Sequence, residues 1–473
     1  MHKDRISSIF ISKIFLLRPS KGIFFITIFF LLSITSIQAD TLKNALEKIY
    51  LTNPSIQSAR LNLRNVDESV SQALSGWRPV ISIDASAGFS DTETDSKLSS
   101  TSPTLTSTST LEPRSYSIAI TEPIYRGGKT LAETRSAELN VQAQRASLKV
   151  TEKEQFLDGI NAYIQVLRWQ YELGLSRTNE KNISQHYEAA KDKYEVGLIN
   201  ATEVLQSKAR AYAAKAERVA SEGALISAEA DYFYIIGDNP ANLSWPIPAS
   251  KLPNNEHDAI NIALKNNHSI LEANYRVLAA REDINVALAD LLPQVSLEAK
   301  YNSQYDVTSL IEKKDQTSLT AIVNIPLYQK GMTHSQIRQS KLRAAEKELH
   351  LELKRKNVIN QTSRAWEELL TSESKLLALK QQVKAAKAGL EGVKQESFVG
   401  LKTTLDVLDA EKDLYTSRVN LVRARADVIV SSYQLKSVLG MLTASSLNFS
   451  TPLYDDNFYY LRAKKKLFGT EIK

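Results

Sequence analysis

Residues 397–415 have the sequence SFVGLKTTLDVLDAEKDLY. Gly400 predicts a tight turn, and the threonines that follow it predict the start of a helix that carries Asp406 and Asp409 one turn apart. A related stretch, YEVGLINATEVLQSKARAY, occupies residues 194–212 and has a glycine in the same place. The chain therefore contains the same glycine turn and helix start twice, and the second copy adds a pair of acids.

The duplication extends beyond these two turns. The block that begins at Ala45 aligns without a gap with the block that begins at Ala259, and Asn53 then matches Asn267. The first half alone carries a polar insert, DTETDSKLSSTSPTLTSTST. We expect this insert to lie at a loop tip, where extra length costs little closure entropy. An internal repeat of this length predicts two copies of one structural unit.

The repeats divide the chain into four expected parts. Residues 1–39 are typical of a secretory signal peptide, with a basic start, a short apolar run and a small-residue cleavage site. An uncleaved anchor helix is the alternative for this segment. The first structural repeat is expected over residues 40–257 and the second over residues 258–447. Residues 448–473 are expected to form a C-terminal equatorial segment and tail.

Each repeat is predicted to contain a helix, two strands, a very long helix, a turn and a returning helix. The first repeat is expected to have a helix at about 41–76, strands at about 80–90 and 114–124, a long helix at about 129–196 and a helix at about 202–238. The second is expected to have, after its first helix, strands at about 294–303 and 317–327, a long helix at about 332–397 and a helix at about 403–440. Each long helix would span roughly 100 Å.

The four predicted strands alternate apolar and polar residues over about ten positions. Alternation also fits a one-sided sheet on a soluble core, but helices of this length offer no compact layer to cover four such strands. Ten residues is about the length of a tilted transmembrane β-strand. A membrane sheet must close into a barrel, and four strands are too few. We therefore expect three chains to supply twelve strands and twelve helical columns.

Composition excludes several classes of protein. The chain has no cysteine, which excludes disulfides and thiolate chemistry. Much of its net charge of +6 comes from the basic start of the chain, so we expect no nucleic-acid partner. The six histidines lack metal-ligand spacing, and no catalytic constellation or nucleotide loop is visible. We expect neither an enzyme nor a cofactor. After the signal, no apolar run reaches the ~18 residues that a transmembrane helix needs.

The duplicated blocks, the strand ends PIYRGG and PLYQKG, the two VGL turns and the string TLDVLDAEKDLYTSRVNLVRARADVIVSSYQLKSVLG together resemble the TolC family of outer-membrane efflux and secretion channels. The resemblance implies a mixed α and β membrane protein. It implies a homotrimer with a twelve-stranded β-barrel, four strands per chain, in outer-membrane lipid. A long α-helical coiled-coil barrel would cross the periplasm. The implied partners are a periplasmic adaptor (membrane fusion protein) and an inner-membrane ABC or RND-type transporter, which supplies the energy.

The resemblance also implies entrance residues. The aspartates that form a charged ring at the periplasmic entrance match Asp406 and Asp409. The basic residue that ties the closed entrance together matches Lys402, and its partners on the neighbouring coil match Thr202 and Glu203. Rings of acids select cations, and repulsion among three copies should raise their pKa values. The alternative role for Asp406 is a helix cap, since acids in a first turn are stabilised by the helix dipole.

The entrance differs from the family pattern at two positions. The resemblance places Ser397 where the best-known member of the family has a tyrosine that makes another closing link, and Lys402 where an arginine forms the latch. Because an ammonium bonds less directionally than a guanidinium, we expect a loosely latched entrance.

The adaptor is expected to dock on the helix tips, at Gly197, Leu198, Gly400 and Leu401.

The sequence thus predicts an outer-membrane channel-tunnel that forms the exit duct of a tripartite export system. Its cargo would be proteins, as in type I secretion, or drugs, as in multidrug efflux, or both. The alternative is a secreted trimeric coiled-coil scaffold or adhesin without a pore. The two differ in conductance, because only a duct passes ions across a planar bilayer.

Overall fold

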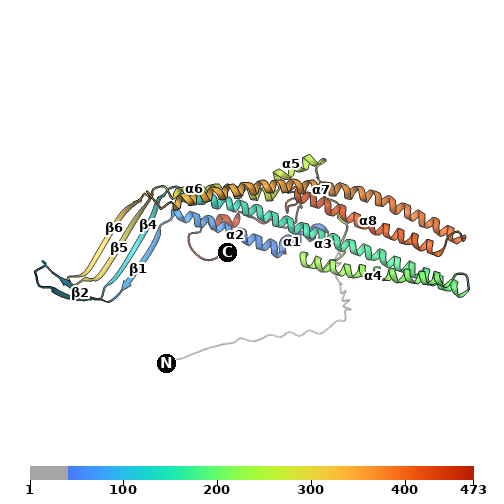
Figure 1. The fold of residues 1–473 in the computed structure, drawn as a ribbon, viewed down its shortest axis with the longest axis horizontal. Coiled ribbons are helices and arrows are strands. Elements are labelled where there is room, and N and C mark those ends of the chain that lie inside the picture. Colours follow the sequence, from blue (N-terminus) through green and yellow to red (C-terminus); the bar gives the residue numbers. More distant parts are fainter. Residues whose placement is uncertain (1–40, 98, 473) are drawn as a thin grey trace, which may run out of the picture. The chain divides into compact units, whose positions relative to one another are not determined.

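The computed structural model describes residues 41–97 and 99–472, so the predicted signal peptide lies outside the described residues. The elements follow one plan twice, with helices, strands, a long helix, a turn and a returning helix. Figure 1 shows the four-stranded sheet at one end of the long helices α3 (Lys129–Glu195) and α7 (Met332–Phe398), with the two turns at their other end. None of the described helices combines the length and the apolar character that a membrane crossing requires.

Each repeat begins with two helices where the sequence analysis predicted one. They are α1 (Leu42–Thr52) and α2 (Pro54–Leu74) in the first repeat, and α5 (Glu256–Asn266) and α6 (His268–Ala289) in the second. The helices of each pair meet at an asparagine, Asn53 or Asn267, whose side-chain oxygen accepts a hydrogen bond from the next helix at 2.9 Å. The prediction of one continuous helix is wrong because this cap ends one helix and starts another.

Four strands form one antiparallel sheet that joins the repeats. They are β1 (Val80–Ala87), β4 (Arg114–Arg126), β5 (Gln294–Thr308) and β6 (Ile311–Asn324), in the order β1-β4-β5-β6. The pairing of β4 with β5 connects the two repeats, and Ile118 lies opposite Tyr301. Every residue of β1 is exposed. No described helix therefore covers this edge of the sheet.

The strands and the insert differ from their predicted form. The four strands have 8, 13, 15 and 14 residues rather than about ten each. The insert, expected to lie at a loop tip, forms a hairpin of β2 (Ser90–Ser96) and β3 (Leu105–Leu111), two strands that were not predicted. Its threonines favour extended backbone, and Thr106 donates a hydrogen bond to Asp95 across the hairpin at 2.6 Å. Periodicity missed these strands because neither of their faces is apolar.

The long helices pair with returning helices to form two hairpins. α3 packs on α4 (Ala201–Ile236), and α7 packs on α8 (Thr404–Val438). Phe156, Ile160 and Tyr163 of α3 are fully buried, and they follow one another at the spacing of three or four residues that a coiled-coil seam requires. α8 also packs along α3. This contact joins the hairpin of the second repeat to that of the first.

The linker between the repeats and the C-terminal segment meet at one buried cluster. Trp245 of the linker and Phe449 and Tyr454 of the C-terminal segment pack against buried residues of α1, α3 and α4. The chain then forms the short helix α9 (Phe458–Lys465), which the sequence analysis did not predict.

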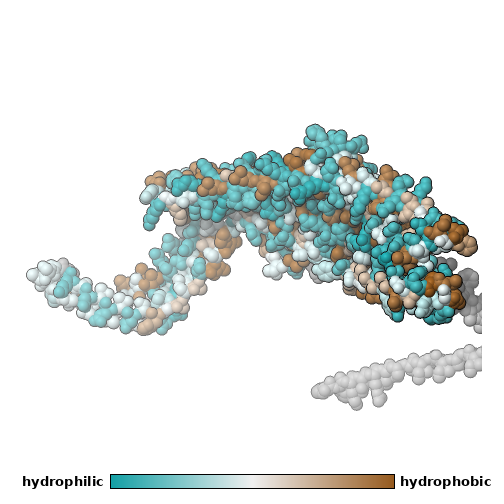
Figure 2. All heavy atoms as spheres, turned by 45° about the vertical axis from the view of Figure 1, so that its right-hand side comes forward, coloured by the Kyte–Doolittle hydropathy of each residue, from teal (hydrophilic) through white to brown (hydrophobic). Residues whose placement is uncertain are grey.

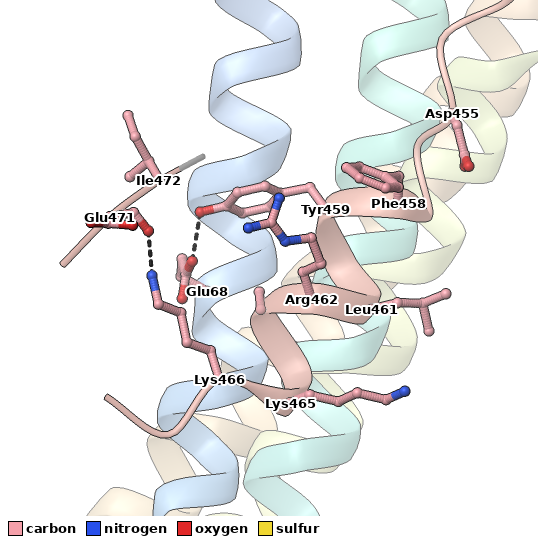
Figure 3. Close-up of a pocket in the computed structure, with 11 residues that line it drawn as sticks. Glu68, Asp455, Phe458, Tyr459, Leu461, Arg462, Lys465, Lys466, Glu471 and Ile472 are labelled. Atoms are coloured by element: carbon pink, nitrogen blue, oxygen red, sulfur yellow. Dashed lines mark hydrogen bonds between the residues drawn. The ribbon is translucent and has the colours of Figure 1, made fainter. Parts of the chain in front are cut away.

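Helix α9 fixes the end of the chain on the helical part of the protein. Tyr459 donates a hydrogen bond to Glu68 of α2 at 2.6 Å, and Lys464 pairs with Glu138 of α3 at 2.8 Å. A pocket of about 580 Å³ lies between α2, α9 and the last residues, where Lys466 also contacts Glu471 (Figure 3). The pocket is built from the C-terminal segment and includes none of the predicted entrance residues.

Candidate functional site

The two turns around Gly197 and Gly400 are built alike. Their glycines have φ values of +76° and +80°, in the left-handed region where other residues are strained. The N–H groups of Leu198 and Leu401 each donate to the carbonyl five residues earlier, at 2.9 Å. This pattern is the Schellman motif, which closes a helix end on a glycine. The α3–α4 and α7–α8 turns therefore share one backbone geometry.

Both turns present apolar side chains at their surface. Leu198 is 73% exposed and Leu401 is 75% exposed, and Phe398 at the end of α7 is 89% exposed. Figure 2, in which the turns come forward, shows apolar surface at the tips of both hairpins. Exposed apolar residues that gather in one place are typical of a contact surface. The residues predicted for adaptor docking lie in these turns.

Asp406 takes part in a capping box at the start of α8. Its N–H donates to Thr403 Oγ1 at 3.2 Å, and its carboxylate accepts from the N–H and the hydroxyl of Thr403, both at 2.8 Å. The hydrogen bond from the backbone, then that from the hydroxyl, hold the pKa of Asp406 below its ordinary value. The repulsion that is expected to raise this pKa acts between the acids of different copies of the chain. The contacts described here lie within one chain and do not include it.

Asp409 pairs with Arg210 of α4, a residue that the sequence analysis did not single out. Arg210 Nη2 donates to Asp409 Oδ1 at 2.7 Å, and the two side chains are 37% and 52% exposed. A pair with this exposure contributes at most about 1 kcal/mol. It nevertheless ties α8 of the second hairpin to α4 of the first, close to the turns.

The predicted latch is not assembled within the chain. Among the described residues, no hydrogen bond or ion pair joins Lys402 to Thr202 or Glu203. Glu203 instead accepts a hydrogen bond from Asn200 at 3.2 Å. Lys402 acts through its charge on Asp406, whose pKa it helps to lower. These latch residues stay a prediction for the assembled entrance.

The apolar residues of the DVLDAE motif hold α8 between its neighbours. Val407 is 5% exposed and packs with Leu390 of α7, whereas Leu408 is 2% exposed and packs with Ile183 of α3 and Ala214 of α4. Adjacent helical positions point about 100° apart, so the two side chains reach different helices. The motif therefore builds a helix junction as well as a pair of acids, and the sequence analysis missed this second role.

Buried carboxylates also join the two hairpins. Glu172 of α3 is 2% exposed and accepts hydrogen bonds from Arg423 of α8 at 3.0 and 2.9 Å and from Arg168 at 2.8 Å. Glu411 of α8 is 6% exposed and lies beside His186 of α3. A heptad pattern identifies apolar positions only, so it cannot distinguish these buried acids from the exposed acids on the same helices. Across residues 41–97 and 99–472, no cluster of three or more His, Cys, Asp or Glu side chains could hold a metal ion.

Comparison with known proteins identifies the family. A family model described as "Outer membrane efflux protein" matches residues 45–237 and 259–441. The chain belongs to this family. The two matched segments fall within the two repeats that the sequence suggested.

Individual relatives match over most of their length. The chain is 31% identical over 435 residues to the outer membrane efflux protein BepC of Brucella suis biovar 1, covering 91% of this chain and 92% of BepC. It is 24% identical over 430 residues to the outer membrane protein TolC of Escherichia coli K12, covering 87% of this chain and 84% of TolC. The solved structure of VceC from Vibrio cholerae matches with a TM-score of 0.71 at 20% identity, covering 84% of this chain and 96% of VceC. This likeness confirms the predicted TolC-like fold.

Membership of the family also confirms three predictions about function. The chain is a protein of the outer membrane, it serves transport, and it is not an enzyme. These conclusions agree with a site that contains helix caps, ion pairs and apolar contacts at the ends of long helices.

Proposed function

We propose that this efflux protein acts as a homotrimer and forms the exit duct of a tripartite export system. An inner-membrane ABC or RND-type transporter would drive the transport, and the cargo would be secreted proteins, drugs or both. The observation that carries the proposal is the four-stranded sheet, which has a mainly apolar face, a mainly polar face and two open edges.

The register of the sheet supports a lipid-facing side and a water-facing side. One row across the first three strands contains Ile83, Ile118 and Tyr301, and the next row contains Asp84, Ser117 and Asn302. Ile83 is 71% exposed within the chain. Exposing apolar surface to water costs about 25 cal/mol per Å², whereas lipid accepts it. The polar rows then suit a water-filled lumen, as in outer-membrane barrels.

The open edges of the sheet support assembly from several copies. β1 and β6 are the outer strands of the sheet, each paired on one side only among the described residues. Unpaired backbone groups are not tolerated in the hydrocarbon region. Pairing β6 of one copy with β1 of the next satisfies both edges. Three copies give twelve strands, which exceeds the roughly eight that the smallest barrels contain.

A stripe on α4 supports contact between neighbouring copies in the helical part. Its apolar residues recur every seven positions and each is more than half exposed, namely Leu205, Tyr212, Val219, Ile226 and Phe233. A strict heptad stripe is the contact pattern of a coiled coil. The buried residues of α4, such as Ser207 and Ala214, are not part of this stripe, and Ala214 packs with Ile183 of α3. A helix of a second copy is therefore the proposed partner of the stripe.

The entrance is proposed to lie at the turns. Asp406 and Asp409 of three copies would form the selectivity ring, and Lys402 would latch the closed state through Thr202 and Glu203. The exposure of the Asp409 side chain supports the ring, because half of it remains accessible despite its ion pair.

The helix tips are the proposed docking place of the periplasmic adaptor. Gly197, Leu198, Gly400 and Leu401 form two turns of one geometry at the surface. Their exposed leucines offer apolar area that no described residue covers. Docking there would place the adaptor, and through it the transporter, at the proposed entrance.

Planar-bilayer recording of the purified protein tests the duct. We expect cation-selective pores whose selectivity falls in the double variant Asp406→Ala/Asp409→Ala. Lys402→Ala should raise the conductance, while Lys412→Ala, which removes an exposed charge from α8, serves as the control. A protein that never conducts would contradict the duct and favour the scaffold or adhesin alternative.

Export assays in a strain that lacks this protein separate the two kinds of cargo. Loss of protein secretion alone indicates a type I system, and loss of drug resistance alone indicates multidrug efflux. A strain with normal secretion and normal resistance would contradict both.

A further inference from the structure

One charged side chain of α8 is buried where the entrance helices meet. Glu411 is 6% exposed and follows Asp409 by two residues, so it points about 200° around the helix from that acid. Asp409 contacts Arg210 of α4. Glu411 contacts α3 and α7 instead. Charged contacts therefore hold α8, which carries both proposed entrance acids, from two opposite sides.

A single oxygen of Glu411 connects three helices. Oε1 lies 3.2 Å from Nε2 of His186 on α3 and 2.9 Å from Nζ of Lys394 on α7. Lys394 and Glu411 belong to the same hairpin. His186 belongs to the other hairpin, so its contact with Glu411 is the one that crosses between the two.

The buried position of Glu411 makes both contacts important. Its Oε2 atom is buried and has no hydrogen-bond partner among the described residues. Burial acts to raise the pKa of Glu411, but the hydrogen bonds and charges of His186 and Lys394 outweigh it, so the pKa lies below its ordinary value. A buried carboxylate without compensating charge is strongly unfavourable. Loss of either contact therefore leaves α8 less firmly held.

The surroundings of this contact contain other charged groups, which line a cavity beside it. A cavity of about 230 Å³ beside Glu411 is lined by Lys387 and Glu391 of α7, by Tyr415 and Arg418 of α8, and by the neutral Asn179 and Asn182 of α3. On α4, Arg210 is engaged with Asp409. Among the described residues, only His186 and Lys394 contact the Glu411 carboxylate directly.

We propose that Glu411 is a positioning residue of the entrance, which locks α8 against α3 through His186 in the closed state. The inference rests on the proposed function as a gated duct. Separating the two hairpins breaks the contact between His186 and Glu411, whereas Lys394 moves together with Glu411. The lock is therefore the histidine contact, and the lysine keeps the carboxylate charged and in place.

Single-channel recording of the full-length protein at one fixed pH tests the lock. Glu411→Gln should raise the open fraction of the channel about tenfold, which corresponds to about 1.4 kcal/mol. His186→Gln should raise the open fraction as well, because it breaks the contact that joins the two hairpins. Asp413→Asn is the matched control, because it removes an exposed acid from the same turn of α8 and should keep the wild-type open fraction.

The outcomes separate this inference from the function on which it rests. Wild-type open fractions in both Glu411→Gln and His186→Gln would overturn the lock and leave the duct standing. A wild type that never conducts would overturn the duct and the lock together. If Glu411→Gln fails to give heat-resistant trimers on a gel, His186→Gln decides alone, because it leaves the pair of Lys394 and Glu411 in place.

Discussion

The α3–α4 turn and the α7–α8 turn have the same backbone but different surroundings. Leu205 lies eight residues after its turn glycine, as Leu408 does, yet the two side chains are 63% and 2% exposed. Lys208 is exposed at the position that the buried Glu411 takes in the second copy. The repeats therefore agree in local structure and disagree in packing.

The difference follows from where each returning helix lies. α8 packs extensively on both α7 and α3, whereas α4 packs extensively on α3 alone. The same helix start thus has two covered sides in α8 and one covered side in α4. The two turns of the duplication share one backbone geometry, and the helices around them determine how each returning helix is packed. In α8 the leucine at this position, Leu408, packs against α3 and α4. In α4 the equivalent Leu205 is exposed and belongs to the stripe that we propose contacts a second copy.

Alanine at the two equivalent leucines should give the largest contrast. Leu408→Ala is expected to lower the free energy of unfolding by about 2–5 kcal/mol, because it empties a buried site. Leu205→Ala is expected to change the stability of a single chain by less than about 0.5 kcal/mol and to reduce trimer formation instead. Denaturant unfolding and chemical cross-linking measure the two effects. Equal losses of unfolding free energy would contradict the comparison.

The caps of the two returning helices should give a smaller contrast. Thr403→Ala and Asn200→Ala each remove a side chain that accepts a hydrogen bond from a first-turn N–H, at 3.2 and 3.0 Å. Each should cost about 1 kcal/mol of unfolding free energy. Only Thr403→Ala also removes a hydrogen bond to the Asp406 carboxylate, so only this variant should raise the pKa of Asp406.

The pH dependence of stability distinguishes the two cap variants. The pKa of Asp406 in the folded chain is below its reference value of 3.8. The stabilisation that the ionised Asp406 contributes to the folded chain is therefore present above that value, and it is lost as the pH falls through the lower folded pKa. Unfolding midpoints measured from pH 5 down to pH 2 should fall less steeply in Thr403→Ala than in the wild type. Asn200→Ala should keep the wild-type slope, and a common slope for all three proteins would be inconsistent with the capping box.

Loss of the exposed pair between the hairpins should have the smallest effect. Arg210→Gln is expected to lower the unfolding free energy by less than about 1 kcal/mol, because both partners are partly exposed. The difference from the wild type should shrink in 1 M salt, where the screening length is about 3 Å. Lys208→Gln removes an exposed charge from the same helix and serves as the control. A loss of several kcal/mol would show that this pair is a structural anchor.

Periodicity accounts for the parts of the fold that the sequence analysis found. Alternation over many residues marks the four strands of the sheet, because apolar and polar side chains of a strand point to opposite faces. The helix breaks at Asn53 and Asn267 were not predicted because an apolar pattern continues across a helix cap. The hairpin of β2 and β3 was not predicted because both of its faces are polar.

The sequence by itself determined the duplication, the two glycine turns, the alternating strands and the acids Asp406 and Asp409 at a helix start. All of these are local patterns in which each residue is interpreted from its near neighbours. Only the tertiary structure decided which charges matter between the hairpins. Glu411 and Asp413 are both acids on α8, two positions apart, yet one is buried and the other is exposed. Burial depends on helices that the chain brings from far away, and His186 is such a distant partner.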